Sequence, residues 1–473
     1  MRPSLRGPER AVWRAFPRGD VVDLRGRADR TVRASVLRTL LLGAQQAEPG
    51  HFATLDLIGA RIVEILDLSN TDVPHPVRMR DCQFDERPDL HSARTQQIDL
   101  AGSTFPGLRC SGAIIDGALR LTGCRSTAEI RLVSARIAGT LLLNAARFEG
   151  TESALNATRL TVGNDILGQK GLICRGEVRL SHAEIGGSVR FDGAHLSNPG
   201  GSALSAPDIV VSAVVNCGEG FRAEGMVELS YASIGSHLSF EQATLSNPTG
   251  TALACQHLDA RELVLLTATP IDGEVDLRHA RLGLLRDDPA TWPDTLRLDG
   301  LTYDALTDIH GVDRLRWLRR DPPGYLPQTY EQLAAVYRRQ GREGDARAVL
   351  LARHRRRRES LPPALRAWGY LQDLTVGYGY LPTRAAAWLV ALLVAGGVTF
   401  GLHHPQVVAG SNPPGFNSVI YTLDLLIPVI DFGQQNAFDP HGALAWLAYG
   451  LIAAGWILAT TIAAGISRTL GPN

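Results

Sequence analysis

Two carboxylates inside an apolar stretch are the residues with the clearest chemical potential. The stretch is 416–432, and its charged side chains are Asp424 and Asp431. Carboxylates in such segments are costly and often line ion paths, provided that the segment re-enters a membrane. If the segment is instead an interfacial helix, both carboxylates face water. The candidate pore or re-entrant residues are Tyr421, Thr422, Asp424, Pro428 and Asp431.

A run of arginines upstream of this stretch is the second candidate group. Guanidinium groups close to a membrane attract anionic headgroups. Nucleic acid is not favoured as a partner, because Lys+Arg and Asp+Glu balance at 48 each over the 473 residues. We therefore expect membrane lipids as the partner of Arg355, Arg356, Arg357 and Arg358.

Sequence motifs for catalysis are missing. There is no dinucleotide-binding glycine pattern, P-loop, HExxH or GxSxG. The six cysteines form no CxxC pair, and no histidine pair has metal-ligand spacing. We therefore predict no catalytic, cofactor or metal site, and enzymatic activity stays uncertain. The cysteines are expected to be buried and unpaired in a reducing compartment.

Two uncharged segments near the carboxyl end are candidate membrane spans. They are 385–402 and 443–466, of 18 and 24 residues. At 1.5 Å per residue they reach about 27 and 36 Å as helices, enough for a bilayer core of about 30 Å.

Arginine placement predicts the orientation of these spans. Several arginines precede the first span and Arg468 follows the second, whereas residues 403–442 contain no Lys or Arg. By the positive-inside rule, both termini are cytoplasmic and the connection is outside. The expected location is the plasma membrane, with two spans.

An internal repeat precedes the carboxyl-terminal part of the chain. Four segments with the pattern φ-x-φ-x-x-Ala-x-φ, where φ is apolar, begin at Ile130, Val178, Val227 and Val275, at intervals of 48, 49 and 48 residues. A fixed period of this size indicates a solenoid. Short alternating runs that turn every five or six residues predict a parallel β-solenoid with two coils per repeat.

These patterns predict a mainly β protein with helices near the carboxyl end. The expected domains are an amino-terminal cap (1–50) with a helix from Ala28 to Leu42, solenoid repeats (51–303), a helical adaptor with a hairpin (304–384) and a membrane module (385–473). A solenoid needs such a cap because its first coil otherwise exposes a sheet edge.

The repeats resemble the pentapeptide-repeat class, in which a small residue precedes a Leu or Phe by two positions, as Ala194 precedes Leu196. The resemblance covers roughly residues 51–303 and implies a β-helix; a less regular right-handed β-helix is the alternative. The dominance of arginine, with Lys170 the only lysine, indicates high-GC coding of actinobacterial type.

The whole chain resembles a bacterial architecture that joins pentapeptide repeats, a helical hairpin and a two-helix ion-channel-like domain. The hairpin residues Tyr330 and Leu333 fit it, as does GYGYLPTR at 377–384. The resemblance places a pore helix at 421–424. Where that family has threonines followed by Gly-Tyr-Gly, this chain has LLIPVIDFG at 425–433, so potassium selectivity is not implied.

Three functions follow from these patterns. The first is a membrane-tethered cytoplasmic solenoid that acts as an interaction, scaffold or sensory module for an unidentified protein partner. The alternative is an ion-channel-like homo-oligomer gated by the solenoid. The third, an oxidoreductase, rests only on a resemblance to actinobacterial proteins named "membrane-associated oxidoreductase".

Overall fold

The chain folds into two compact units. The computed structural model describes residues 5–307, 311–321, 326–380, 382–408, 415–427 and 430–470. We call Met1–Gln340 the solenoid unit and Gly341–Asn473 the helical unit. The domain boundaries expected from the sequence, at 50, 303 and 384, stay predictions.

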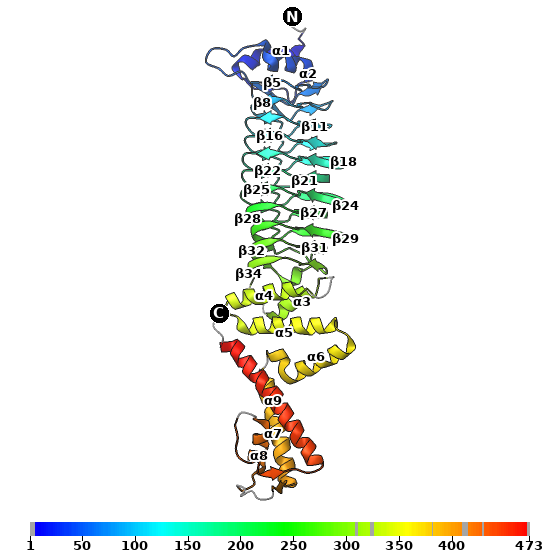
Figure 1. Ribbon diagram of the computed structural model, residues 1–473. Coiled ribbons are helices and arrows are strands. Elements are labelled where there is room, and N and C mark those ends of the chain that lie inside the picture. Colours follow the sequence, from blue (N-terminus) through cyan, green and yellow to red (C-terminus); the bar gives the residue numbers. More distant parts are fainter. Residues whose placement is uncertain are drawn as a thin grey trace. The chain divides into compact units, whose positions relative to one another are not determined.

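The solenoid unit is a parallel β-solenoid of about 11 turns, as predicted. Each coil passes through four short faces, which we call a, b, c and d in chain order, and each face pairs in parallel with the same face of the next coil. Figure 1 shows the resulting columns of stacked strands.

The strands are assigned to faces by their pairing. Face a contains β1 (Val22–Asp23), β3 (Leu55–Ile58), β6 (Val77–Arg80), β9 (Ile98–Asp99), β13 (Leu119–Arg120), β17 (Leu141–Leu142), β20 (Ile166–Leu167), β23 (Val189–Arg190) and β26 (Val215–Asn216). Face d contains β5 (Asp72–Val73), β8 (Arg94–Thr95), β12 (Ile114–Ile115), β16 (Arg136–Ile137), β19 (Thr161–Val162), β22 (Glu184–Ile185) and β25 (Val210–Val211). The late strands β28 (Ser233–Ser239), β30 (Asp259–Leu265), β32 (Arg281–Asp287) and β34 (Thr302–Leu306) run through faces d and a.

Faces b and c form the other side of each coil. Face b begins with β2 (Thr31–Arg33), β4 (Arg61–Val63), β7 (Gln83–Phe84), β10 (Thr104–Phe105) and β14 (Arg125–Ser126), and face c contains β11 (Leu108–Arg109), β15 (Ile130–Arg131) and β33 (Leu296–Arg297). The strands β18 (Arg147–Asn156), β21 (Ile173–Arg179), β24 (His195–Ser205), β27 (Arg222–Glu228), β29 (Thr244–Ala254) and β31 (Asp272–Asp276) run through both faces.

Strand register confirms two coils per repeat. Ile130 pairs with Leu155, and Leu155 pairs with Val178, so two coils separate the start of one 48-residue repeat from the next. The repeat alanines point inward as expected: Ala183 and Ala232 are 0% and 1% exposed. The apolar interior is the main stabilising element, because burying one Leu or Val side chain contributes about 1.5–3 kcal/mol.

The amino-terminal residues cap the first coil, as Figure 1 shows. They form α1 (Gly7–Ala15), the 3₁₀ turn η1 (Phe16–Arg18), α2 (Ala34–Thr39) and the π turn η2 (Leu40–Ala44). The helix expected from Ala28 is therefore too long. Residues Thr31–Arg33 form β2 instead, because pairing with β4 supplies their backbone with hydrogen-bond partners.

The end of the solenoid unit contains η3 (Pro289–Thr291), α3 (Gly311–Leu318) and α4 (Pro327–Arg339). Arg314 is fully buried, and its guanidinium donates to both carboxylate oxygens of Asp287. The indole of Trp292 also donates to Asp287, at 2.7 Å. This buried network fastens α3 to the last coils.

The helical unit contains α5 (Glu343–Glu359), α6 (Pro363–Val376), η4 (Gly377–Gly379), α7 (Pro382–Leu402), β35 (Gln406–Val407), α8 (Ser418–Leu426), β36 (Phe438–Asp439) and α9 (Ala443–Leu470). Two of its helical segments, Thr383–Leu402 and Ala443–Thr460, are long and apolar enough to cross a membrane. The helices α4 and α5 predicted for the hairpin both form, on either side of Gly341.

Candidate interaction surface

The corner between faces b and c carries the most distinctive surface of the solenoid. Long strands with protruding loops (β18, β24 and β29) alternate there with shorter strands (β21, β27 and β31). The protruding loops centre on Gly150, Pro199 and Pro248, so each loop lies two coils from the next. Adjacent strands lie about 4.8 Å apart, which gives a loop spacing of about 9.6 Å.

Each of the shorter strands contributes a glycine beside the protruding loop of the preceding coil. These are Gly176, Gly225 and Gly273, with φ of 107°, 121° and 125°. A Cβ at Gly225 would lie 2.5 Å from the carbonyl oxygen of Asn198, and the other two positions are equally tight. Two conditions therefore require glycine at these positions: the positive φ of the backbone and the lack of space for a Cβ atom.

Asparagine side chains close the necks of two of the loops. The amide of Asn198 donates to the carbonyl of Ser202 at 2.9 Å, and that of Asn247 donates to Thr251 at 2.8 Å. These equivalent bonds hold the tips at Pro199 and Pro248 in the same protruding conformation.

Three open cavities lie along this corner, and we call them notches 1, 2 and 3. Notches 1 and 2 lie between successive loops, and notch 3 lies between the loop at Pro248 and residues 294–297. Their volumes are about 480, 460 and 480 Å³. Notch 1 is lined by residues including Glu149, Thr151, Arg175 and Asn198; notch 2 by Pro199, Arg222, Glu224, Ser246 and Pro248; notch 3 by Thr249, Asp272, Glu274, Asp294 and Arg297.

The charges of the notches differ along the row. In notch 1, Glu149 and Arg175 form an exposed ion pair at 3.2 Å. In notch 2, the hydroxyl of Ser197 donates to Glu224 at 2.8 Å and lowers the pKa of that carboxyl. In notch 3, Glu274 pairs with Arg297 at 2.7 Å, while Asp272 and Asp294 are exposed. The formal charge falls from zero in notches 1 and 2 to −2 in notch 3.

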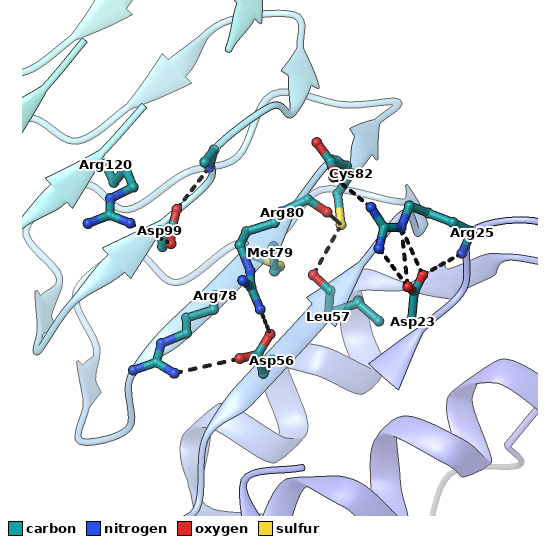
Figure 2. Close-up of polar contacts among 12 residues, drawn as sticks. Asp23, Arg25, Asp56, Leu57, Arg78, Met79, Arg80, Cys82, Asp99 and Arg120 are labelled. Atoms are coloured by element: carbon teal, nitrogen blue, oxygen red, sulfur yellow. Dashed lines mark hydrogen bonds and ion pairs between the residues drawn. The ribbon is translucent and has the colours of Figure 1, made fainter. Parts of the chain in front are cut away.

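A second polar cluster lies on the surface of the first coils (Figure 2). On face a, the outward residues Asp56, Arg78, Asp99 and Arg120 occupy successive strands, so their charges alternate. Asp56 is 5% exposed and lies between Arg78 at 3.6 Å and Arg80 at 2.7 Å. Opposite charges on neighbouring strands stabilise the pairing, so this cluster has a structural explanation.

Stacked rings mark the corner between faces c and d. The rings of Tyr231 and His257 are 4.7 Å apart, and those of His257 and His279 are 4.8 Å apart. All three residues have left-handed backbone angles, which each coil needs at this turn. The ring spacing equals the strand spacing, so this ladder follows from the solenoid geometry.

In the helical unit, α8 packs against both α7 and α9. Two glycines allow this approach: a Cβ at Gly396 would lie 2.4 Å from the Thr422 methyl group, and one at Gly455 would lie 2.2 Å from the carbonyl oxygen of Leu426. Tyr421 and Thr422 are buried in this contact. The end of α8 therefore lies beside the middle of the apolar part of α9.

Asp424 is buried, and its carboxylate is hydrogen-bonded to the backbone of the same chain. Its carboxylate accepts hydrogen bonds from the backbone N–H groups of Phe432 (2.9 Å), Gln434 (2.9 Å) and Gln435 (2.7 Å). Asp431 is exposed, and its carboxylate accepts a hydrogen bond from the N–H of Gly433. The geometry favours a role for Asp424 in holding this loop, and Pro428 lies outside the described residues.

Several arginines of the run 355–358 contact neighbouring side chains of the protein. Arg355 and Arg358 both bind Asp373, and Arg358 also stacks on Tyr370 with its guanidinium carbon 3.8 Å from the ring centre. Arg356 pairs with Glu359, and Arg357 is exposed.

No family model, curated protein or solved structure matches this chain.

The notches were not predicted from the sequence, although a signal for them is present. The segments RGEV at 175–178, EGMV at 224–227 and DGEV at 272–275 share a glycine followed two residues later by valine. These segments line the three notches, and the SNP loops at 197–199 and 246–248 form two of the ridges that border them.

Proposed function

We propose that this chain is a membrane-anchored scaffold. In this proposal, α7 and α9 cross the plasma membrane, and the solenoid lies in the cytoplasm and binds a protein partner. The exposed side chain of Arg357 favours contact with anionic headgroups, whereas Arg355, Arg356 and Arg358 pair with Asp373 or Glu359.

The carrying observation is the uncovered apolar surface of α7 and α9. Val390, Val394 and Val398 follow one another at four-residue spacing and are 60%, 60% and 57% exposed. On α9, Trp446 is 78% and Trp456 53% exposed. Continuous apolar surface of this kind needs a cover, and helices of this length match the thickness of a bilayer.

Cysteine labelling on intact cells tests the anchoring and its orientation. The six native thiols are all buried, and burial raises the pKa of the thiols of Cys82, Cys110, Cys124 and Cys174 to about 12, so they give little background. His441→Cys, in the exposed connection, should react with an impermeant thiol reagent, and Ser360→Cys should react only after lysis.

The opposite labelling pattern would overturn the orientation. Release of the whole chain from membranes by alkaline carbonate would overturn the anchoring itself. The two outcomes are independent, because carbonate extraction reports whether the chain is embedded in the membrane and thiol labelling reports which side of the membrane each residue faces.

A channel-like homo-oligomer is the second candidate. It is favoured by α8, whose Leu426 carbonyl oxygen lies beside Gly455, since the carbonyl end of a helix carries partial negative charge that attracts cations. Current recording in liposomes tests it. Asp431→Asn is the informative variant, because Asp431 is exposed whereas Asp424 holds the loop. A lower cation current in this variant would support an ion path past Asp431, and an unchanged current would exclude that carboxylate from it. No current from the native chain would exclude a channel.

A further inference from the structure

The three notches form a periodic surface, and the period constrains what fits it. They recur every two coils, about 9.6 Å apart. A polyproline II helix rises about 3.1 Å per residue with three residues per turn, so every third side chain points the same way after about 9.3 Å. The mismatch is about 0.3 Å per step, and over the two steps of this row it stays well below the width of a side chain.

A β-strand ligand does not share this period. Its side chains return to the same face after two residues, or about 6.8 Å, and the third residue points away. Such a peptide could place one side chain in a notch, but the next side chain on the same face would collide with the protruding loop at Pro199 or Pro248. The row therefore selects for a three-residue repeat.

The charges specify the side chains. Glu224 in notch 2 is 42% exposed, and its lowered pKa keeps it ionised. Its carboxylate lies 3.3 Å from His195, and Arg222 lines the same notch, so a cationic side chain there would compete with these two groups. Asp272 occupies the equivalent position in notch 3, where Ser246 donates to it at 2.9 Å and Asp294 adds a second exposed carboxylate. Two cationic side chains three residues apart would meet both carboxylates, whereas the phosphates of a nucleic acid would be repelled.

We propose that the row of notches binds an extended, proline-rich basic peptide in the polyproline II conformation, with cationic side chains at positions i and i+3 entering notches 2 and 3. Notch 1, whose Glu149 and Arg175 neutralise each other, takes the third side chain of the series. This inference rests on the proposed scaffold function and names the class of its partner.

The test uses the full-length chain in detergent and two fluorescent heptapeptides of identical composition. One has three arginines separated by pairs of prolines, and the other has three arginines separated by single prolines. We expect the first peptide to bind at least about tenfold more tightly, because one charge-assisted hydrogen bond contributes about 1.5–3 kcal/mol.

Variants then locate the binding. Glu224→Gln combined with Asp272→Asn should weaken the first peptide about tenfold or more. Thr249 lines both notch 2 and notch 3. Thr249→Tyr adds a bulky side chain there without removing a charge, so it should also weaken binding of the first peptide. The matched control is Asp259→Asn, an exposed carboxylate on face d, and it should leave binding unchanged.

Equal binding of the two peptides, or no binding by either, would overturn the proposal. The same loss with Asp259→Asn as with the notch variants would show unspecific charge attraction and overturn it too. If a neutral sugar polymer such as a chitin oligosaccharide displaced the first peptide, the row of notches would bind a different kind of polymer and the proposal would be wrong. Because binding is measured in detergent, its failure is separate from a failure of membrane anchoring, which the cysteine labelling reports.

Discussion

The solenoid and the helical unit distribute the same residue types in opposite ways. In the solenoid, Leu, Ile, Val and Ala face inward and charged pairs such as Arg78 and Asp56 face outward. In the helical unit, Val394 and Trp446 face outward, and the buried Asp424 lies inside a loop network. This contrast teaches that the coils present a polar surface to water, whereas α7 and α9 are long and apolar enough to cross a membrane.

The largest expected effect comes from placing a charge inside the coils. Ala183→Arg puts an unpaired guanidinium at a fully buried position and should destabilise the solenoid by several kcal/mol. Thermal unfolding followed by circular dichroism measures this change. Glu184→Arg, on the exposed side of the adjacent position, is the control and should change stability by less than about 0.5 kcal/mol. Similar stability of the two variants would place Ala183 outside the interior.

A smaller loss is expected at the cap. Glu9 is fully buried and accepts hydrogen bonds from the Arg6 N–H and from the backbone and side chain of Arg33. Glu9→Gln should cost about 3 kcal/mol, because it removes the buried carboxylate charge that faces the Arg33 guanidinium. The control is Glu48→Gln, which breaks an exposed pair with Arg18 and should cost less than about 1 kcal/mol.

The same pair makes the cap sensitive to acid. Burial alone raises the pKa of Glu9, but the bonds from Arg33 and Arg6 outweigh it and hold the pKa at about 2, below the ordinary value of 4.5. A lowered pKa gives stability that is complete above pH 4.5 and is lost as the pH falls towards 2. Glu9→Gln should therefore flatten the stability profile in this pH window, and an unchanged profile would contradict the assignment.

The smallest effect should occur in the loop of the helical unit. Asp424→Asn weakens three backbone hydrogen bonds and should cost about 2 kcal/mol, measured as faster proteolysis of the connection after α8 in detergent. Asp431→Asn loses one exposed bond and should have little effect. Equal proteolysis of the two variants would show that the carboxylate of Asp424 does not hold this loop.

The sequence by itself determined the solenoid because its evidence is local and repeated. The alternation around Ala183 and Ala232 recurs at a fixed interval, and each copy reports the same inward face. It also marked the two apolar helices, since an uncharged run of 18 or more residues is visible without any tertiary contact. The cap helix was overestimated because pairing of β2 with β4 overrode a helical pattern.

Tertiary structure alone decided which side chains meet. The notches depend on strand register, which places Glu224 and Asp272 two coils apart on one corner although 48 residues separate them. The role of Asp424 depends on a loop that returns to it from residues 432–435. A sequence pattern reports which face a residue lies on, but these partners are set by how the chain stacks and folds back, and that information is not local.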